Sequence, residues 1–259
     1  MSTPVQITII AKSGGPLTKR ISLAADGSLI SDGSACVMSR GTATRFTFAD
    51  IGQLAALIEH FGPHQAITLG RLRPDLPNEV EVVTKRLLNG GDNSRTVART
   101  REFFAYRPGQ SALALVDYDT KGMPASIIEK ISQLGGFWPA LLSVIQRLAG
   151  VRRLERKSTS AGLFRADTGQ KLRSIGGTHV FLAVLDGDDI ERFLKTLHER
   201  CWLAGFGWMM VGRGGQLLER SIVDRMVFGP ERLVFEGPPT LDPPLGQDTE
   251  PRKPEVRYG

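Results

Sequence analysis

Two aspartates at the end of an apolar run are the residues whose types and spacing most directly indicate chemistry. Residues 112–116 lack the polar alternation of a half-solvated strand, so they predict a buried strand that leads into Asp117 and Asp119. Side chains alternate along a strand, and both carboxylates should therefore point to one side. Such like charges repel unless a cation lies between them, and their oxygens suit Mg²⁺ or Mn²⁺. The alternative is a strand that runs into an Asp-rich turn.

A histidine precedes a second apolar run. His179 follows Gly-Gly-Thr and opens the stretch Val-Phe-Leu-Ala-Val-Leu, which predicts another buried strand. The small residues before it allow a large ligand to approach the backbone closely. A histidine at the start of a buried strand is also commonly a hydrogen-bonded structural residue, so both interpretations stay open at this point.

A third aspartate lies in an apolar setting. Asp224 occurs within Ile-Val-Asp-Arg-Met-Val-Phe, where we expect a strand and where an unpaired carboxylate would be costly. It either pairs with Arg220 or Arg225, or it completes a metal site with Asp117 and Asp119.

The interval 147–173 is strongly basic. It is opposed only by Glu155 and Asp167, and its net charge equals the +6 of the whole chain. A localised basic segment is typical of proteins that bind phosphates, although a solvated basic face is the commoner explanation of a charge run. Inside it, the loop 158–162 offers the hydroxyls of Ser158 and Ser160 and backbone N–H groups that could hold phosphate oxygens. The basic residues are Arg147, Arg152, Arg153, Arg156, Lys157, Arg165, Lys171 and Arg173.

Composition limits the class of protein. A chain of 259 residues with 41% hydrophobic and 23% charged residues is typical of a soluble globular protein with one large or two small domains. Cys36 and Cys201 are far apart, which favours a reducing compartment and excludes a zinc ribbon built from this chain alone. We find neither a signal peptide nor an apolar run of membrane-spanning length, so the expected location is cytoplasmic and no membrane partner is expected.

Strands and helices alternate along the chain around these residues. Residues 5–11 predict a first strand, and 48–61 predict a helix with Thr47 as its N-cap. Further helices are expected over 124–134, 138–150 and 189–202. Beyond Gly237 six prolines stand among scattered charges, which predicts a tail or linker that builds no core.

The order of these motifs resembles that of the archaeo-eukaryotic primase superfamily, in particular the primase-polymerases of plasmids, phages and mobile elements. That family has an acidic pair separated by one residue, a small-x-His motif and a later hydrophobic-Asp motif. Here they correspond to Asp117 and Asp119 in Val-Asp-Tyr-Asp, to His179 in Gly-Gly-Thr-His, and to Asp224 in Ile-Val-Asp. The resemblance covers about residues 94–246. One departure is Gly177, because the family often has serine there.

The resemblance implies an α+β fold, in which a divergent RNA-recognition-like catalytic sheet packs against a second α/β unit. It divides the chain into an N-terminal α/β scaffold portion (1–90), a primase catalytic core (91–237) and a Pro-rich C-terminal tail or linker (238–259). The implied activity is DNA-template-dependent nucleotidyl transfer, as primer synthesis or DNA polymerisation. The implied partners are a single-stranded DNA template and nucleoside triphosphates, and a helicase domain or protein is a further candidate.

The resemblance also implies the roles of individual residues. Two Mg²⁺ or Mn²⁺ ions, about 3.5–4 Å apart, would activate the attacking 3′-hydroxyl and stabilise the leaving pyrophosphate. Asp117, Asp119 and Asp224 would hold these ions, and His179 would contact the triphosphate of the incoming nucleotide. Further candidate contacts to the nucleotide are Ser158, Ser160 and Arg173.

Two alternatives come from other classes. The first is a phosphohydrolase of the haloacid-dehalogenase type, with Asp117 and Asp119 in one acidic loop and the Asp-rich segment 186–189 in another. That family expects Thr or Val where this chain has Lys121, and more than a hundred residues precede the acidic strand. The second is a non-catalytic replication-initiator or single-strand DNA-binding module, which would have no use for a third buried carboxylate at Asp224.

Overall fold

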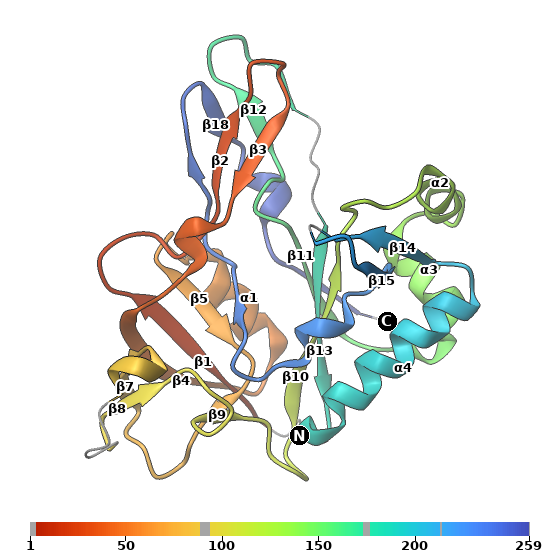
Figure 1. The fold of residues 1–259 in the computed structure, drawn as a ribbon. Helices are drawn as coiled ribbons and strands as arrows, with labels where there is room; N and C mark the ends of the chain where they lie inside the picture. The colour runs from red at the N-terminus through yellow and green to blue at the C-terminus, as the bar shows by residue number, and fades with distance from the viewer. Residues whose placement is uncertain (1–3, 89–93, 173–176, 213, 259) are drawn as a thin grey trace.

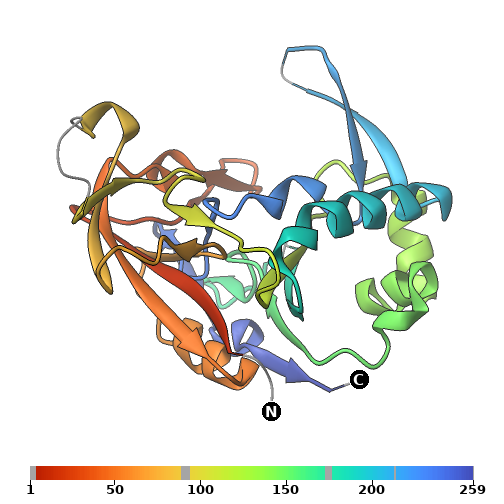
Figure 2. The ribbon, with the colours of Figure 1, turned by 90° about the horizontal axis from the view of Figure 1, so that it is seen from below.

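The computed structural model describes residues 4–88, 94–172, 177–212 and 214–258. Helices make up 24% and strands 34% of the chain, which confirms the predicted α+β class. In Figures 1 and 2 a first sheet and a group of helices lie on opposite sides of a second sheet. The candidate residues concentrate on that second, central sheet.

The first sheet has six strands and is antiparallel except for its last pair, β7 and β8. In order across the sheet, the strands are β16 (Leu233–Val234), β5 (Gln65–Thr68), β1 (Val5–Lys12), β4 (Arg40–Phe48), β7 (Glu79–Val83) and β8 (Thr96–Ala98). The edge strand β16 comes from the C-terminal part of the chain. The first sheet is therefore not built by the N-terminal residues alone.

Helix α1 (Ile51–Glu59) follows β4 and begins later than the sequence indicated. Its N-cap is Asp50, whose Oδ1 accepts a hydrogen bond from the Gly52 N–H at 2.7 Å, while the Gln53 side chain accepts one from the Asp50 N–H at 3.2 Å. This reciprocal capping box satisfies the exposed donors of the first turn. The predicted cap, Thr47, instead belongs to β4, because the strand pairing with β1 extends to Phe48.

The second sheet has four antiparallel strands. In order, they are β10 (Ala112–Tyr118), β13 (Thr178–Val184), β11 (Arg153–Lys157) and β19 (Glu255–Arg257). The two apolar runs singled out in the sequence are thus neighbouring strands, and residues 112–116 are buried as predicted. Apolar side chains on both faces of β10 fit a strand that is covered from two sides.

Three longer helices cover the side of the second sheet away from the first sheet (Figure 1). They are α2 (Ala125–Gln133), α3 (Phe137–Val144) and α4 (Ile190–Leu203). Short 3₁₀ helices lie at η1 (Ser34–Cys36), η2 (Lys85–Leu87), η3 (Gln146–Leu148), η4 (Gly187–Asp189), η5 (Arg225–Phe228) and η6 (Glu250–Arg252). Among the described residues, none of the helices combines the length and the apolar character that crossing a bilayer requires.

Small sheets extend from this body. A lobe at the top of Figure 1 is built around the buried residues Ile21, Leu163 and Leu245. Its strands are β2 (Arg20–Leu23), β3 (Leu29–Asp32), β12 (Leu163–Arg165), β17 (Thr240–Leu241) and β18 (Leu245–Gln247). The remaining pairs are β6 (Arg71–Leu72) with β9 (Phe104–Ala105), and the projecting hairpin of β14 (Gly207–Val211) and β15 (Leu217–Ser221).

The main hydrophobic cluster draws on both of the predicted larger portions. It joins Ile7 and Leu54 of the first portion to Leu115 and Phe181 of the second sheet, all nearly inaccessible to solvent. Residues 238–258 differ from the tail or linker that the prolines predicted, since they contribute β17, β18 and β19 to three different sheets. Prolines exclude long regular strands, but two- and three-residue strands between them are still possible.

Candidate functional site

Asp117 and His179 face each other across neighbouring strands. The register of β10 and β13 pairs these two residues directly. Nε2 of His179 lies 3.7 Å from Oδ1 of Asp117, and the two side chains are 19% and 24% exposed. The structure therefore brings together two residues that the sequence singled out separately, at a position open enough for a ligand to reach.

The other side of the His179 ring is held by a carboxylate that the sequence analysis missed. Nδ1 of His179 and Oε1 of Glu236 are 2.5 Å apart, and Glu236 is only 1% exposed. Oε2 of Glu236 is 3.3 Å from Nη1 of Arg156. Nη2 of Arg252 donates hydrogen bonds of 3.3 Å to the backbone carbonyls of Glu236 and Gly237. We call His179, Glu236, Arg156 and Arg252 the buried ion network.

The charges of this network support one another. Burial alone would lower the pKa of His179, but the Glu236 carboxylate and then Asp117 outweigh it and raise the pKa. Burial alone would raise the pKa of Glu236, but His179, Arg156 and Arg252 outweigh it and lower the pKa. Each partner therefore favours the charged form of the other.

Asp224 is adjacent to the end of β10, although it does not lie in a strand as we expected. β15 ends at Ser221, and Asp224 caps η5 by accepting a 2.8 Å hydrogen bond from its backbone. The N–H of Asp224 donates to the carbonyl oxygen of Asp117 at 3.0 Å. Of its two predicted partners, Arg220 lies 4.0 Å away, whereas Arg225 pairs with Glu219. The third aspartate is thus tied by its backbone to the first.

Asp119 lies just beyond β10 and is exposed. Its Oδ1 accepts a hydrogen bond of 3.0 Å from the N–H of Lys121. Asp119 and Asp224 line one small hollow, which the hairpin side chains Trp208, Met210 and Arg220 also border. The three predicted metal ligands therefore surround one end of β10.

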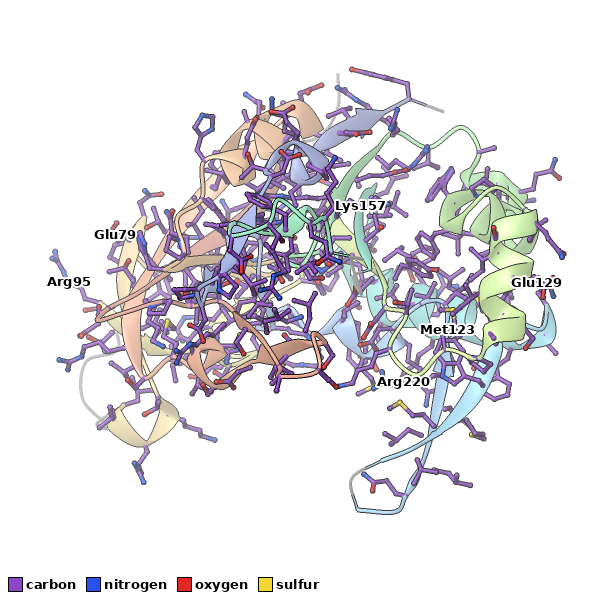
Figure 3. All side chains as sticks on the ribbon, turned by 90° about the horizontal axis from the view of Figure 1, so that it is seen from above. Glu79, Arg95, Met123, Glu129, Lys157 and Arg220 are labelled. Atoms are coloured by element: carbon purple, nitrogen blue, oxygen red, sulfur yellow. The ribbon has the colours of Figure 1, made fainter. Side chains whose placement is uncertain are left out.

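The view in Figure 3 locates this region within the molecule. Lys157 and Arg220 lie in its middle, between the part of the first sheet near Glu79 and Arg95 and helix α2, which carries Glu129. Arg220 borders the hollow that Asp119 and Asp224 line, so this hollow belongs to the middle part of the molecule.

The carboxylates have the donor chemistry of a magnesium or manganese site. Burial, together with the charges of Asp224 and Asp119, raises the pKa of Asp117, while His179 and Arg232 oppose the rise. A divalent cation would relieve this repulsion through hard oxygen ligands. Among the residues that the structure describes, however, no three His, Cys, Asp or Glu side chains lie close enough together to form a metal site as they stand.

The loop that carries Ser158 and Ser160 lies at the start of β13. The N–H of Ser158 donates to the Gly177 carbonyl at 3.1 Å, and the two serine hydroxyls are 3.1 Å apart. The amide of Gln247 donates to the carbonyls of Thr159 and Ala161 at 2.9 and 2.8 Å. The predicted serine loop is therefore fixed by the C-terminal segment and lies two residues from His179 along β13.

Gly177 has a clear steric reason to lack a side chain. A Cβ atom built there would lie 1.5 Å from the carbonyl oxygen of Tyr118. The backbone of β10 thus occupies the space in which the serine common in the resembled family would stand. Any phosphate contact at this position would have to come from the backbone.

Much of the basic interval 147–173 serves to hold the structure together. Four of its arginines form ion pairs inside the chain, so they do not present a free cationic surface. The pairs are Arg152 with Asp50, Arg153 with Glu155, Arg156 with Glu236 and Arg165 with Asp167. Lys157 and Lys171 are exposed. The predicted nucleotide contact Arg173 lies outside the described residues.

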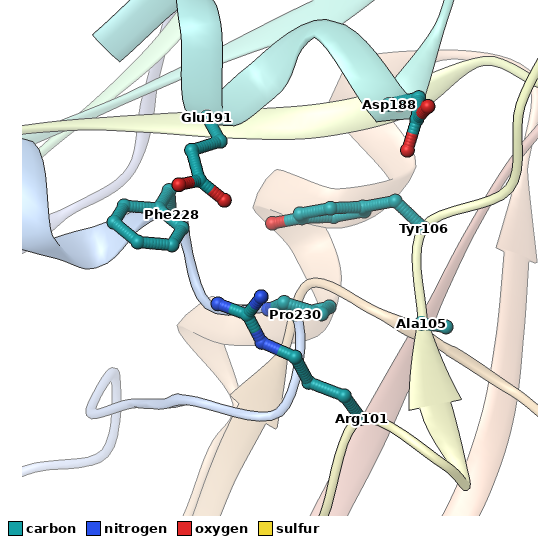
Figure 4. Close-up of a pocket in the computed structure, with 8 residues that line it drawn as sticks. Arg101, Ala105, Tyr106, Asp188, Glu191, Phe228 and Pro230 are labelled. Carbon is teal, nitrogen blue, oxygen red and sulfur yellow. The ribbon is translucent and has the colours of Figure 1, made fainter. Parts of the chain in front are cut away.

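A larger hollow lies at the opposite end of β10 (Figure 4). It is lined by Arg101, Tyr106, Asp188, Glu191 and Phe228, among others, and its volume is about 170 Å³. The Tyr106 hydroxyl points toward Glu191 (Figure 4), and no hydrogen-bond partner for it lies within the described residues.

The register separates this hollow from the aspartate pair. Val184, which precedes the Asp-rich segment 186–189, pairs with Ala112, five residues before Asp117 on β10. At about 3.3 Å per residue, the two acidic segments are roughly 16 Å apart. The single acidic centre that the phosphohydrolase alternative requires is therefore not assembled.

Comparison with protein-family models, with curated protein sequences and with solved structures finds no match to this chain. The candidate function therefore depends on the residues and their geometry.

Proposed function

We propose that this protein is a DNA-template-dependent nucleotidyltransferase of the archaeo-eukaryotic primase type, acting as a primase or primase-polymerase. The second sheet would be its RNA-recognition-like catalytic sheet, and the first sheet with α1 would be the second α/β unit. Its substrates would be nucleoside triphosphates and a single-stranded DNA template.

The observation that carries the proposal is the convergence of three separate motifs at one end of β10. His179 is 3.7 Å from Asp117, and the N–H of Asp224 is bonded to the Asp117 carbonyl. Asp119 follows two residues later and lines one hollow with Asp224. A purely structural role would not require two further carboxylates, Asp119 and Asp224, near the half-buried Asp117, because their repulsion raises the free energy of the folded chain.

The residues divide the task by their chemistry. Asp117, Asp119 and Asp224 would hold two divalent ions, which would supply activation of the attacking 3′-hydroxyl and charge stabilisation of the leaving pyrophosphate. His179, whose pKa Glu236 and Asp117 raise against the effect of burial, would donate its Nε2–H to a phosphate oxygen of the incoming nucleotide. Ser158, Ser160 and exposed lysines nearby would contact the remaining phosphate oxygens.

The direct test is incubation with a primed or unprimed single-stranded template, labelled nucleotides and Mg²⁺ or Mn²⁺. We expect products longer than the input, and none with Asp117→Ala or Asp224→Ala. Extension by these variants at the wild-type rate would refute the proposal. Circular dichroism of both variants controls for loss of the fold.

A second candidate function is a non-catalytic module that binds single-stranded DNA. It is favoured by the spacing of the carboxylates, since no three acidic or histidine side chains among the described residues form a metal site as they stand. The same experiment separates the two candidates, because a binding module would retain the template in a mobility-shift assay without lengthening it.

A further inference from the structure

The C-terminal segment reaches the candidate nucleotide site through the buried ion network. Arg252, in η6, is 4% exposed, and its carbonyl accepts a 3.1 Å hydrogen bond from Nε of Arg156. Nη1 of Arg156 also donates to the Ile58 carbonyl of α1 at 2.7 Å. Glu236 is therefore held by Arg156 of β11 and Arg252 of η6, and α1 in turn holds Arg156.

We propose that Glu236 is a positioning residue that aims the imidazole of His179, and that Arg156 and the C-terminal Arg252 hold Glu236 in place for this purpose. This proposal rests on the proposed function for its catalytic consequence. It extends that function by assigning a role to residues outside the three motifs, and it makes the segment 238–258 part of the site.

Geometry supports this role. An imidazole ring can rotate about its bond to the Cβ atom, and rotation by half a turn would exchange the places of its nitrogens with those of its carbons. The 2.5 Å contact from Nδ1 of His179 to Glu236 selects one orientation, in which Nε2 points toward Asp117. A second hydrogen-bonded partner commonly fixes a functional histidine in this way.

The connectivity also explains why the carboxylate itself does not rotate. Each oxygen of Glu236 has its own cationic partner, Oε1 with His179 and Oε2 with Arg156. Arg252 bonds the Glu236 backbone. Arg156 and Arg252 thus hold Glu236 in place, and Glu236 in turn sets the orientation of the His179 ring.

Steady-state kinetics of primer extension with Glu236→Gln tests the catalytic consequence. The amide keeps the shape but removes the charge, so we expect KM for the nucleotide to rise about tenfold with a smaller change in kcat. Glu155→Gln is the matched control, because Glu155 lies on β11 next to Arg156 and is likewise paired with an arginine, Arg153, yet no contact joins it to His179. Its kinetics should equal those of the wild type.

A double-mutant cycle separates positioning from general stability. If Glu236 acts through His179, then Glu236→Gln should have no further effect on KM in a His179→Ala background. Additive effects of the two substitutions would overturn the proposal.

NMR spectroscopy of the wild-type protein tests the hydrogen bond between His179 and Glu236 directly. This measurement requires neither folded variants nor enzymatic activity. In ¹⁵N-labelled protein, Nδ1 of His179 should resonate as a protonated nitrogen with a strongly downfield proton that exchanges slowly. An unprotonated Nδ1 would overturn the proposal. A protonated Nδ1 in a protein without polymerase activity would instead refute only the proposed function and leave the positioning of His179 established.

Discussion

Nε2 of His179 lies 3.7 Å from Oδ1 of Asp117 because the two residues occupy paired positions on the antiparallel strands β10 and β13. Strand pairing, and not a flexible loop, therefore sets this distance. Sites built on regular elements hold their side chains more precisely than sites on loops. The two strands consequently fix the Asp117–His179 pair relative to the rest of the candidate site.

Replacing Asp117 with Asn should separate activity from stability. Burial, reinforced by Asp224 and Asp119, raises the pKa of Asp117 despite the opposing charge of His179, so the ionised group costs free energy in the folded chain at neutral pH. We expect Asp117→Asn to reduce nucleotide incorporation to background while its Tm in metal-free buffer rises. Differential scanning calorimetry and a primer-extension assay measure the two effects.

Asp188→Asn is the control for that experiment. Asp188 is exposed and lies at the far end of β10, beside the larger hollow. Its neutralisation should change neither activity nor Tm measurably. A lower Tm for Asp117→Asn, with no change for Asp188→Asn, would contradict this prediction. It would show that the ionised Asp117 stabilises the folded chain and that Asp119 and Asp224 do not destabilise it by repulsion.

The contribution of the His179–Glu236 pair to stability should depend on pH with a defined sign. Burial opposes both charges, but each partner overcomes it, so the pKa of His179 is raised from 6.5 and that of Glu236 is lowered from 4.5. The stabilisation from His179 is complete below 6.5 and is lost as pH rises through its raised pKa. The stabilisation from Glu236 is complete above 4.5 and is lost as pH falls through its lowered pKa.

Urea denaturation of wild type and His179→Gln across pH measures this difference. The loss of unfolding free energy should be greatest between pH 4.5 and 6.5, where both groups are charged in the folded and unfolded chains. A loss of roughly 1.5–3 kcal/mol is typical of a hydrogen bond to a charged group. It should shrink in alkaline buffer. A pH-independent loss would mean that His179 contributes packing alone.

Elements with strong local patterns were predictable from the sequence. The apolar run of β10 is buried throughout residues 112–116, and Val180, Phe181 and Leu182 of β13 are buried, although Ala183 near its end and Leu185 just beyond it are exposed. Helix α4 follows its apolar periodicity from Ile190 to Leu203. The boundary between β4 and α1 was less predictable, because a strand-pairing signal and a helix-capping signal overlap there. Strand pairing continued β4 past Thr47, so the helix cap moved to Asp50, which has the stronger capping partner in Gln53.

Features that depend on distant contacts could not be predicted. Glu236 stands between Phe235 and Gly237, and an acidic residue in so apolar a run is a signal of a buried partner, but the sequence does not say which one. The sequence places Arg156 in a basic run that predicts phosphate binding. In the structure Glu236, 80 positions away, pairs with this arginine, and a count of local charges cannot include so distant a partner. The C-terminal strands were hidden by prolines, since pairing of two or three residues leaves no periodic pattern.

Gly177→Ala should damage the site without touching any of its ionisable groups. The new Cβ would meet the Tyr118 carbonyl oxygen at 1.5 Å, so β10 and β13 would have to move apart next to the Asp117–His179 pair. We expect a loss of roughly 1–3 kcal/mol of unfolding free energy, as is typical of overpacking, and a larger proportional loss of activity. Gly150→Ala, where a Cβ meets nothing within 4 Å, should be tolerated. Equal stability of the two variants would contradict the steric interpretation.

Binding of single-stranded DNA should depend on the exposed lysines of the basic interval more than on its arginines. Arg165 and Lys171 belong to the same β-lobe, and Phe164 forms a backbone bridge with Lys171. Arg165, however, is bound by both oxygens of Asp167, at 3.0 and 2.6 Å, whereas Lys171 is exposed. A guanidinium already bonded to a carboxylate must break that pair to contact phosphate, which cancels much of the gain.

Fluorescence anisotropy of a labelled single-stranded oligonucleotide over a range of salt concentrations measures the difference. Each phosphate neutralised contributes about −0.7 to the slope of log K against log salt on single strands. We therefore expect Lys171→Ala to flatten the slope by about 0.7 and Arg165→Ala to change it much less. Affinity that is insensitive to salt in the wild type would remove the basis for a phosphate-binding surface here. Equal flattening by both variants would instead show that Asp167 releases Arg165 when DNA binds, because only a released guanidinium can displace a counterion.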